Sequence, residues 1–277
     1  MEFRKLTLDS MNMLRPYFSD NQCRICDCTI GGTFIWRDYH NTEYALVDEV
    51  LYIKVAYPEQ AFAPPRNAEP GKRSYERIID YCSATGFPMR FCAVSETVLE
   101  VILEMFPDSK TRTDRSWSDY LYISEDITSL AGRRFAGQRN HINRFMRENP
   151  SWSFERITKE RIPEVKEFYS KFAREHVKDS EAYDEGNRKA LEVLDNIDAY
   201  KLGGGVLYVG DEVVGASLGE TVDDTLFIHS EKADTDHHGA YPMLVNQFAK
   251  VFVSEGIEFI NREEDDGDEG LRTSKLS

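Results

Sequence analysis

LFIHSEKADTDHHGAYPMLVNQFAKVFVSEGIEFI, residues 226–260, contains the clearest secondary-structure pattern in the chain. Residues 226–233 follow an Asp-Asp turn and predict a strand. A polar loop, residues 234–239, leads into a helix that begins near Pro242 and ends at Gly256, because the apolar residues between them recur at helical spacing. Residues 257–260 predict a second strand. This order of strand, loop, helix and strand predicts an α/β architecture.

The segments before this unit predict a hairpin and two helices. Residues 205–219 predict a β-hairpin that turns at Gly210-Asp211. Residues 162–177 and 184–194 have the apolar spacing of helices. The run Gly203-Gly204-Gly205 precedes a strand where a phosphate loop would precede a helix, so we interpret it as a flexible linker.

The first half of the chain repeats part of this order. A hairpin is predicted over residues 43–55, and a Pro-rich loop separates it from a predicted helix over 74–83. A strand over 87–94, a helix over 95–106 and a strand over 120–123 follow. Because the order of elements occurs twice, we predict an α/β (α+β) protein of two halves, residues 1–128 and 129–277, with mixed sheets flanked by helices.

Composition limits the classes of function. A net charge of −15 disfavours general nucleic-acid coating, which depends on clustered Lys and Arg. No window approaches the roughly 20 apolar residues of a membrane helix. The N-terminus lacks the features of a signal peptide, so we expect a cytoplasmic protein without a membrane span.

The cysteines predict reduced thiols and no metal centre. There are five, an odd number in a chain without an export signal. Cys23, Cys26 and Cys28 have part of the spacing of a zinc site, but the second ligand pair is missing and the nearest candidate is His40. We therefore predict no metal-binding residues.

Residues 129–149 predict an amphipathic helix with one strongly basic face. That face carries Arg133, Asn140, Arg144 and Arg147, and Arg134 and Arg139 flank it. One interpretation is a solvated face whose arginines pair with nearby carboxylates. The other is a docking surface for a phosphate-bearing partner, such as tRNA or a lipid headgroup.

Three segments together resemble a known family: residues 27–37, residues 133–145 and residues 261–272. They are similar to a bacterial family of soluble proteins related to the C-terminal domain of phosphatidylglycerol lysyltransferases. The resemblance covers nearly the whole chain. It implies two GNAT-like acyltransferase halves in tandem, as in the lysyltransferase and peptidoglycan-bridge (Fem) groups, which transfer aminoacyl groups from tRNA to an amine or hydroxyl.

The resemblance also implies where a donor would bind, and the loop there departs from the usual GNAT pattern. GNAT loops read Q/R-x-x-G-x-G/A and hold the pyrophosphate of coenzyme A. Here Asp236 takes the first position and repels pyrophosphate, which disfavours coenzyme A and favours a different donor. The two donors considered are acyl-CoA and aminoacyl-tRNA. No other cofactor is predicted. The predicted donor-binding residues are His237, His238, Gly239, Ala240 and Tyr241, with Arg139, Asn140 and Arg144 from the basic helix.

The resemblance leaves the acceptor open. The membrane-embedded half of the lysyltransferases has no counterpart here, so a lipid acceptor is not implied, and a small molecule or peptide is expected. A GNAT half would continue with more strand after Arg272, so we expect the sequence to be incomplete at its C-terminal end.

Acyl transfer needs a base and donors for an oxyanion. Glu231, at the end of a predicted strand beside the loop, is the preferred base; Glu220 and His238 are the alternatives. The acidic run 263–269 has three interpretations: a Mg²⁺ or Ca²⁺ site, a site for a cationic acceptor, or a cap on the following helix. The predicted acceptor-binding residues are Arg262, Glu263, Glu264, Asp265 and Arg272.

Two functions follow as hypotheses. The first is an acyltransferase that moves an acyl or aminoacyl group to an amine or hydroxyl acceptor, with tRNA bound along the helix of Arg133 to Arg147. The second is a catalytically silent GNAT-fold module that binds a phosphate-bearing or small cationic ligand, because fold similarity does not establish activity.

Overall fold

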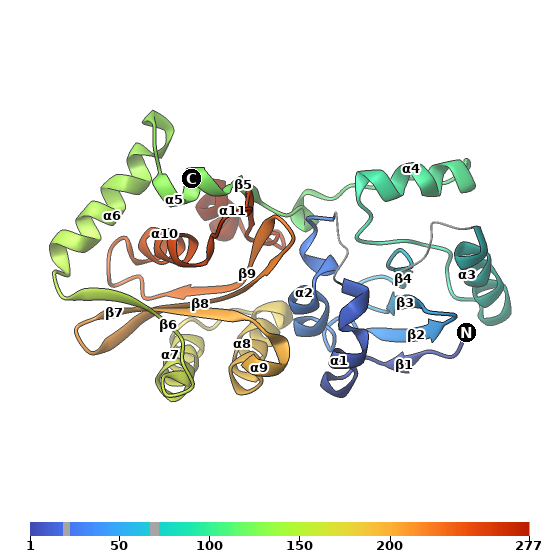
Figure 1. Cartoon of the computed structure of the whole chain (residues 1–277), viewed down its shortest axis with the longest axis horizontal. Coiled ribbons are helices and arrows are strands. Elements are labelled where there is room, and N and C mark those ends of the chain that lie inside the picture. Colours follow the sequence, from blue (N-terminus) through green and yellow to red (C-terminus); the bar gives the residue numbers. More distant parts are fainter. Residues whose placement is uncertain (19–22, 67–71, 277) are drawn as a thin grey trace. The chain divides into compact units, whose positions relative to one another are not determined.

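The computed structural model describes residues 1–18, 23–66 and 72–276, and it contains two compact units, Met1–Arg112 and Thr113–Ser277 (Figure 1). The division falls earlier than the predicted boundary after residue 128. The reason is that β5 (Leu121–Ile123) pairs with β10 (Phe259–Asn261), and α5 (Ser124–Ser129) packs against α10 (Ala240–Phe252). Residues 113–128 therefore belong to the C-terminal unit.

The N-terminal unit has a four-stranded antiparallel sheet in the order β1-β2-β3-β4. Its core is formed by apolar side chains such as Tyr52, Phe62 and Ile78. The predicted hairpin and the helices predicted over 74–83 and 95–106 are confirmed. Its elements are β1 (Arg4–Lys5), α1 (Met11–Leu14), α2 (Ile30–Ile35), β2 (Glu43–Val47), β3 (Val50–Val55), β4 (Ala61–Phe62), α3 (Lys72–Thr85) and α4 (Glu96–Met105).

The strand predicted over residues 87–94 is wrong. Phe91 forms a single isolated bridge with Phe62. The neighbouring strand, β4, is only two residues long, so its edge is too short to pair with a strand over residues 87–94. Ala93 then adopts a φ of 50°, which ends the extended backbone.

The C-terminal unit has a six-stranded sheet in the order β5-β10-β9-β8-β7-β6. β10 runs parallel to β9, and the other neighbours are antiparallel. The strands not yet given bounds are β6 (Trp152–Arg156), β7 (Gly203–Val209), β8 (Glu212–Val222) and β9 (Thr225–Ala233).

Helices cover both faces of this sheet (Figure 1). α10 packs on β8 and β9 from one side, where Leu244 and Phe248 are fully buried. On the other side α7 packs on β8 and on α8. The remaining helices are α6 (Ala136–Glu148), α7 (Ile162–Glu175), α8 (Glu181–Asp195), α9 (Ile197–Tyr200) and α11 (Glu269–Leu276).

The strand-loop-helix-strand unit predicted over residues 226–260 is confirmed as β9, α10 and β10. The interpretation of Gly203-Gly204-Gly205 as a flexible linker is wrong, because all three lie inside β7. A Cβ atom on Gly203 would lie 2.3 Å from the Phe252 ring, and one on Gly205 would lie 2.3 Å from the Phe154 ring. These glycines are needed because aromatic side chains pack directly on the strand backbone.

The register of β9 leaves part of its edge open. β10 pairs with only the first three residues of β9, Thr225 to Phe227. On its other edge, β9 pairs with β8, but the register shifts between Leu218, opposite Ser230, and Gly219, opposite Ile228. His229 is therefore the extra residue of a β-bulge. Because of this extra residue, the alternation of side chains between the two faces of β9 is shifted by one position after His229.

No helix in the described ranges is long and apolar enough to cross a membrane.

Candidate active site in the C-terminal unit

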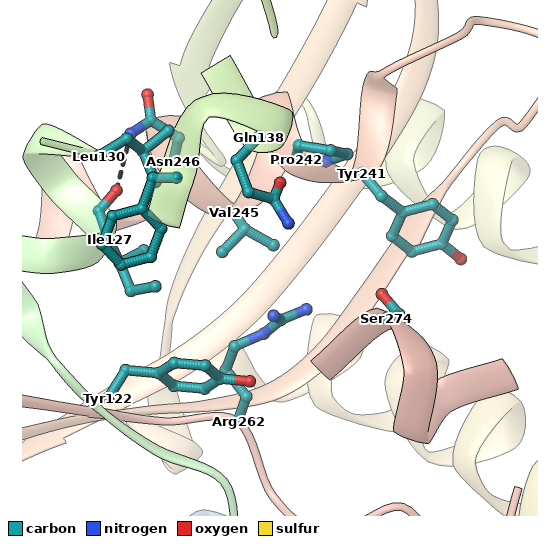
Figure 2. Close-up of a pocket in the computed structure, with 11 residues that line it drawn as sticks. Tyr122, Ile127, Leu130, Gln138, Tyr241, Pro242, Val245, Asn246, Arg262 and Ser274 are labelled. Atoms are coloured by element: carbon teal, nitrogen blue, oxygen red, sulfur yellow. Dashed lines mark hydrogen bonds between the residues drawn. The ribbon is translucent and has the colours of Figure 1, made fainter. Parts of the chain in front are cut away.

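A cleft in the C-terminal unit lies between the start of α10, the junction of α5 and α6, and the end of β10 (Figure 2). It encloses about 560 Å³, part of it open to solvent. Its polar lining consists of Tyr122, Gln138, Tyr241, Asn246, Arg262 and Ser274. In Figure 2 Gln138 and Pro242 face Arg262 and Tyr122 across this space.

Arg262 and Glu231 form an ion pair where β9 and β10 separate. The Nη2 atom of Arg262 lies 2.7 Å from Oε2 of Glu231, and its Nε lies 3.1 Å from both carboxylate oxygens. The Arg262 side chain is 9% exposed and that of Glu231 is 11% exposed. The preferred base and a predicted acceptor-binding residue are thus partners in one buried pair.

A second buried cluster is centred on the bulge residue His229. Its Nδ1 lies 2.8 Å from a carboxylate oxygen of Glu263, and its Nε2 lies 3.0 Å from one of Glu220. Burial by itself lowers the pKa of His229, but the hydrogen bonds to the two carboxylates outweigh it and raise the pKa to about 10. His229 is therefore a cation at neutral pH, and it holds Glu220 and Glu263 in place.

The rest of the acidic run holds α11 against the end of β10. Asp265 is fully buried and accepts hydrogen bonds from Arg272, at 2.8 and 2.9 Å, and from the Tyr120 hydroxyl at 2.5 Å. The hydrogen bond from Arg272 is the main cause of the strongly lowered pKa of Asp265. Asp268 accepts from the backbone N–H of Leu271 at 2.9 Å, in the first turn of α11, as the helix-cap interpretation expects.

The loop predicted to bind the donor lies against α6. The ring of His238 contacts His141 with a nitrogen–nitrogen distance of 3.0 Å, and His237 contacts the Asn149 side chain at 3.1 Å. Gly239, with a φ of 88°, precedes the first turn of α10 at Ala240. A Cβ atom on Gly239 would lie 2.3 Å from the His141 carbonyl oxygen, so only glycine allows this approach. Tyr241 reaches the cleft, and burial raises its pKa to about 12.

The basic helix is shorter than predicted. Leu130, with a φ of 51°, ends α5, and α6 begins only at Ala136. Arg139 donates to the carbonyl oxygens of Leu130 and Gly132, which fixes the turn between the helices. Arg144 pairs with Glu148 at 2.8 Å, as the solvated-face interpretation expects. Asn140, Arg144 and Arg147 remain exposed on α6.

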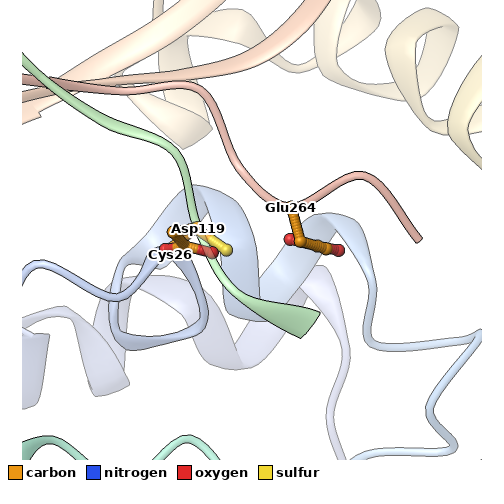
Figure 3. Close-up of side chains that lie close together, drawn as sticks. All are labelled: Cys26, Asp119 and Glu264. Carbon is orange, nitrogen blue, oxygen red and sulfur yellow. The ribbon is translucent and has the colours of Figure 1, made fainter. Parts of the chain in front are cut away.

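Asp119 and Glu264 form another acidic group in this unit (Figure 3). Their carboxylate oxygens lie within 4.8 Å of each other, and Asp119 accepts a hydrogen bond from Asn261 at 2.6 Å. Two carboxylates supply fewer oxygens than the six to eight of a typical Ca²⁺ site, at about 2.3–2.6 Å. The pair by itself predicts no metal. Cys26, also drawn in Figure 3, is a buried residue of the N-terminal unit.

Sequence reasoning missed four residues of this region. His229 was placed in a strand without a role, and no local pattern marks it as a bulge between two carboxylates. Tyr122 and Gln138 line the cleft from β5 and α6, far from residues 226–260 in sequence. Ser217 lies opposite Glu231 in the register, and its buried hydroxyl has no hydrogen-bond partner within the described residues. An unusual polar residue in a buried strand was the available signal.

Comparison with protein families gives one match over most of the chain. A family model described as "Phosphatidylglycerol lysyltransferase, C-terminal" matches residues 23–277. An uncharacterised protein of Mycoplasmoides gallisepticum is 24% identical over 165 residues, which is 58% of this chain and 52% of that protein. The chain therefore spans about half the length of this curated relative.

Comparison with solved structures shows the fold. A Bacteroides thetaiotaomicron protein of unknown function is 29% identical, with a TM-score of 0.91 over 100% of this chain and 94% of that one. A domain assigned as the C-terminal part of a lysylphosphatidylglycerol synthetase from Agrobacterium fabrum is 11% identical, with a TM-score of 0.65 over 98% and 83%. FemX is 9% identical, with a TM-score of 0.54 over 99% and 93%. The predicted α/β fold class, with two units whose sheets are flanked by helices, is confirmed.

Proposed function

Because the chain belongs to the family described as phosphatidylglycerol lysyltransferase, C-terminal, we propose that it transfers an acyl or aminoacyl group to an amine or hydroxyl acceptor. The observation that carries this proposal is the open edge of β9, where Glu231 and Arg262 meet beside the cleft at the start of α10. A donor lying along this edge would place its carbonyl next to both charged side chains.

The donor would bind at the first turn of α10. The positive end of the helix dipole favours phosphate there, and Gly239 allows the loop to approach α6 closely. Few N–H groups are free at this turn, because Pro242 has none and the N–H of Ala240 donates to the His237 carbonyl oxygen. Asp236 is exposed in this loop and would repel the pyrophosphate of coenzyme A. We therefore infer that the donor is an aminoacyl-tRNA whose backbone phosphates contact Asn140 and Arg144 on α6.

The two charged residues at the edge would have different roles. Arg262 lines the cleft and would stabilise the negative charge that develops on the carbonyl oxygen. Glu231 would accept the proton of the attacking amine or hydroxyl as the new bond forms, and would return it to the tRNA ribose oxygen that leaves when the ester bond breaks. Glu231 is held in its ion pair with Arg262, so it would act as the base once the substrate oxygen draws Arg262 away. Glu220 is held by His229, which makes it the weaker candidate.

The test is a transfer assay with radiolabelled aminoacyl-tRNAs. Total tRNA charged with each amino acid in turn is incubated with the protein and with a panel of amines, amino acids and peptides. We expect one aminoacyl-tRNA to lose its label to an acceptor faster than it hydrolyses in buffer. A parallel set of reactions contains radiolabelled acetyl-CoA in place of the tRNAs. A chain that consumes neither donor with any acceptor would contradict the proposal.

Coenzyme A should not stabilise the protein. A ligand present at 100 times its dissociation constant adds about 2.7 kcal/mol to the free energy of unfolding, which is several degrees in Tm. Because Asp236 stands where pyrophosphate would bind, we expect the Tm in saturating coenzyme A or acetyl-CoA to equal that in buffer. A clear rise in Tm, lost again in an Arg262→Met variant, would show that acyl-CoA is the donor.

One observation favours the silent binding module as a second candidate. Glu231, Glu220 and Asp265 are each engaged by a basic residue of the same unit, which is an arrangement typical of structural ion pairs. A module would retain charged and uncharged tRNA equally and release no acyl group. Salt-dependent tRNA binding without transfer of the acyl group in the assay above would support the binding module and exclude the transferase.

A further inference from the structure

Lys232 lies on the opposite face of β9 from Glu231. Neighbouring residues on a strand point to opposite faces, and Glu231 reaches Arg262 after β10. The Nζ atom of Lys232 instead lies over two aromatic rings, 5.4 Å from the centroid of Phe172 on α7 and 4.8 Å from that of Tyr183 on α8. Lys232 therefore faces the side of the sheet that α7 and α8 cover.

The ammonium group of Lys232 has no acidic side chain at ion-pair distance among the described residues. Within the same ranges it makes no hydrogen bond. The adjacent carboxylate, Glu231, is bound to Arg262. Lys232 is half-buried, and a partly desolvated cation without an ion-pair partner points to a missing anion.

Two further lysines add positive charge around Lys232. Lys178 lies 5.4 Å from the centroid of the Tyr183 ring and is paired with Asp268 at 2.6 Å. Lys275 donates to the carbonyl oxygens of Arg262 and Glu264, both at 2.5 Å, and these carry no formal charge. Burial first, and then the charges of Lys178 and Lys275, lower the pKa of Lys232 to about 8, although the Glu231 carboxylate acts in the opposite direction.

The hydroxyl of Tyr183 is the second unpaired group. It is buried and has no hydrogen-bond partner within the described part of the chain. The same ring contacts the ammonium groups of both Lys178 and Lys232. An oxygen acceptor with negative charge would satisfy the hydroxyl and the Lys232 ammonium together.

We propose that Lys232 and Tyr183 form an anion subsite that takes the carboxylate or phosphate group of the acceptor substrate. This inference rests on the proposed function, because the donor would occupy the α10 face of β9 and leave the α7–α8 face to the acceptor. The two substrates would then meet at the open edge of β9, between Glu231 and Lys232.

The experiment measures anion binding to the full chain by calorimetry, at constant ionic strength in chloride buffer. The two probes are inorganic phosphate and N-acetylalanine, which carries one carboxylate. We expect the wild-type protein to bind one of them, and Lys232→Met to weaken that binding by about tenfold, as for loss of one hydrogen bond to a charged group. Tyr183→Phe should weaken it by a smaller factor. Binding of phosphate alone supports a phosphate-bearing acceptor, and binding of the carboxylate alone supports an amino acid or peptide.

The matched control is Lys250→Met, which removes the same charge from an exposed position of α10 and should leave binding unchanged. If neither probe binds, or if Lys232→Met and Lys250→Met bind as the wild type does, the subsite does not exist. Should Lys232→Met fail to fold, the NMR resonance of the Lys232 Nζ atom in the wild-type protein gives a second measurement. We expect this resonance to shift when the probe binds. A resonance that does not shift overturns the proposal. Anion binding requires no donor, so this result is independent of the transfer assay.

Discussion

Replacing His229 by leucine should lower the free energy of unfolding by about 3–5 kcal/mol, the usual loss when one partner of a buried ion pair is removed. His229 has no exposed side-chain surface and lies between the carboxylates of Glu220 and Glu263. Leucine fills similar space but leaves both carboxylates without a donor. Urea unfolding at neutral pH measures the difference. A loss below about 1 kcal/mol would show that the cluster is not ionic.

The same cluster predicts a pH dependence with a definite sign. The folded pKa of His229, about 10, is above the ordinary value of 6.5 for a histidine side chain. The folded state therefore binds the proton more tightly, and the stabilisation is complete below about pH 6.5 and lost as pH rises through about 10. Wild-type stability should fall between these values, and His229→Leu should remove that part of the slope. His176→Leu is the control, since His176 is partly exposed and bonds to a backbone carbonyl.

Replacing Arg262 by methionine should reduce transfer activity by about 100-fold or more, the effect of removing one oxyanion donor. The same change leaves Glu231 buried beside the cleft without its partner, so stability should also fall. Steady-state kinetics in the transfer assay and urea unfolding measure the two effects separately.

A double variant distinguishes the two roles of Arg262. In Arg262→Met/Glu231→Leu the whole ion pair is removed, so most of the lost stability should return. Activity should not return, because both proposed catalytic groups are gone. A double variant as active as the wild type would show that the pair is only structural. Arg156→Met is the control, since Arg156 is exposed and donates to the carbonyl oxygen of Val251.

The local elements of the C-terminal unit could be predicted because their signals are local. Residues 226–260 carry a strand, a polar loop and a helix with one apolar face, and they form β9, α10 and β10. Gly239, at the start of α10, was also correctly placed in the loop. The prediction of a strand over residues 87–94 was wrong because it depended on a non-local feature. These residues favour extended structure, but a strand also needs a partner edge, and β4 has only two residues.

The pairing of charged side chains required the tertiary structure. Glu231 and Arg262 were predicted as functional residues, but as a base and an acceptor-binding group rather than as one ion pair. Glu220 and Glu263 are joined only through His229, at a bulge that exchanges the faces of β9. Such contacts depend on the register of strands that are distant in sequence, and register leaves no local pattern.

For Lys232, too, one feature could be predicted from the sequence and another required the tertiary structure. Its place in a strand beside Glu231 follows from alternation along residues 226–233. That it faces Tyr183, with no acidic side chain of the described residues at ion-pair distance, depends on how α7 and α8 pack on the sheet. Hydrophobic periodicity and glycine positions thus determine the order of elements, the fold class and the loop before α10, because these features depend on residues a few positions apart. Which charges are paired and which remain free for a substrate is decided by packing between elements, because Coulomb energy depends on distance in space and on burial.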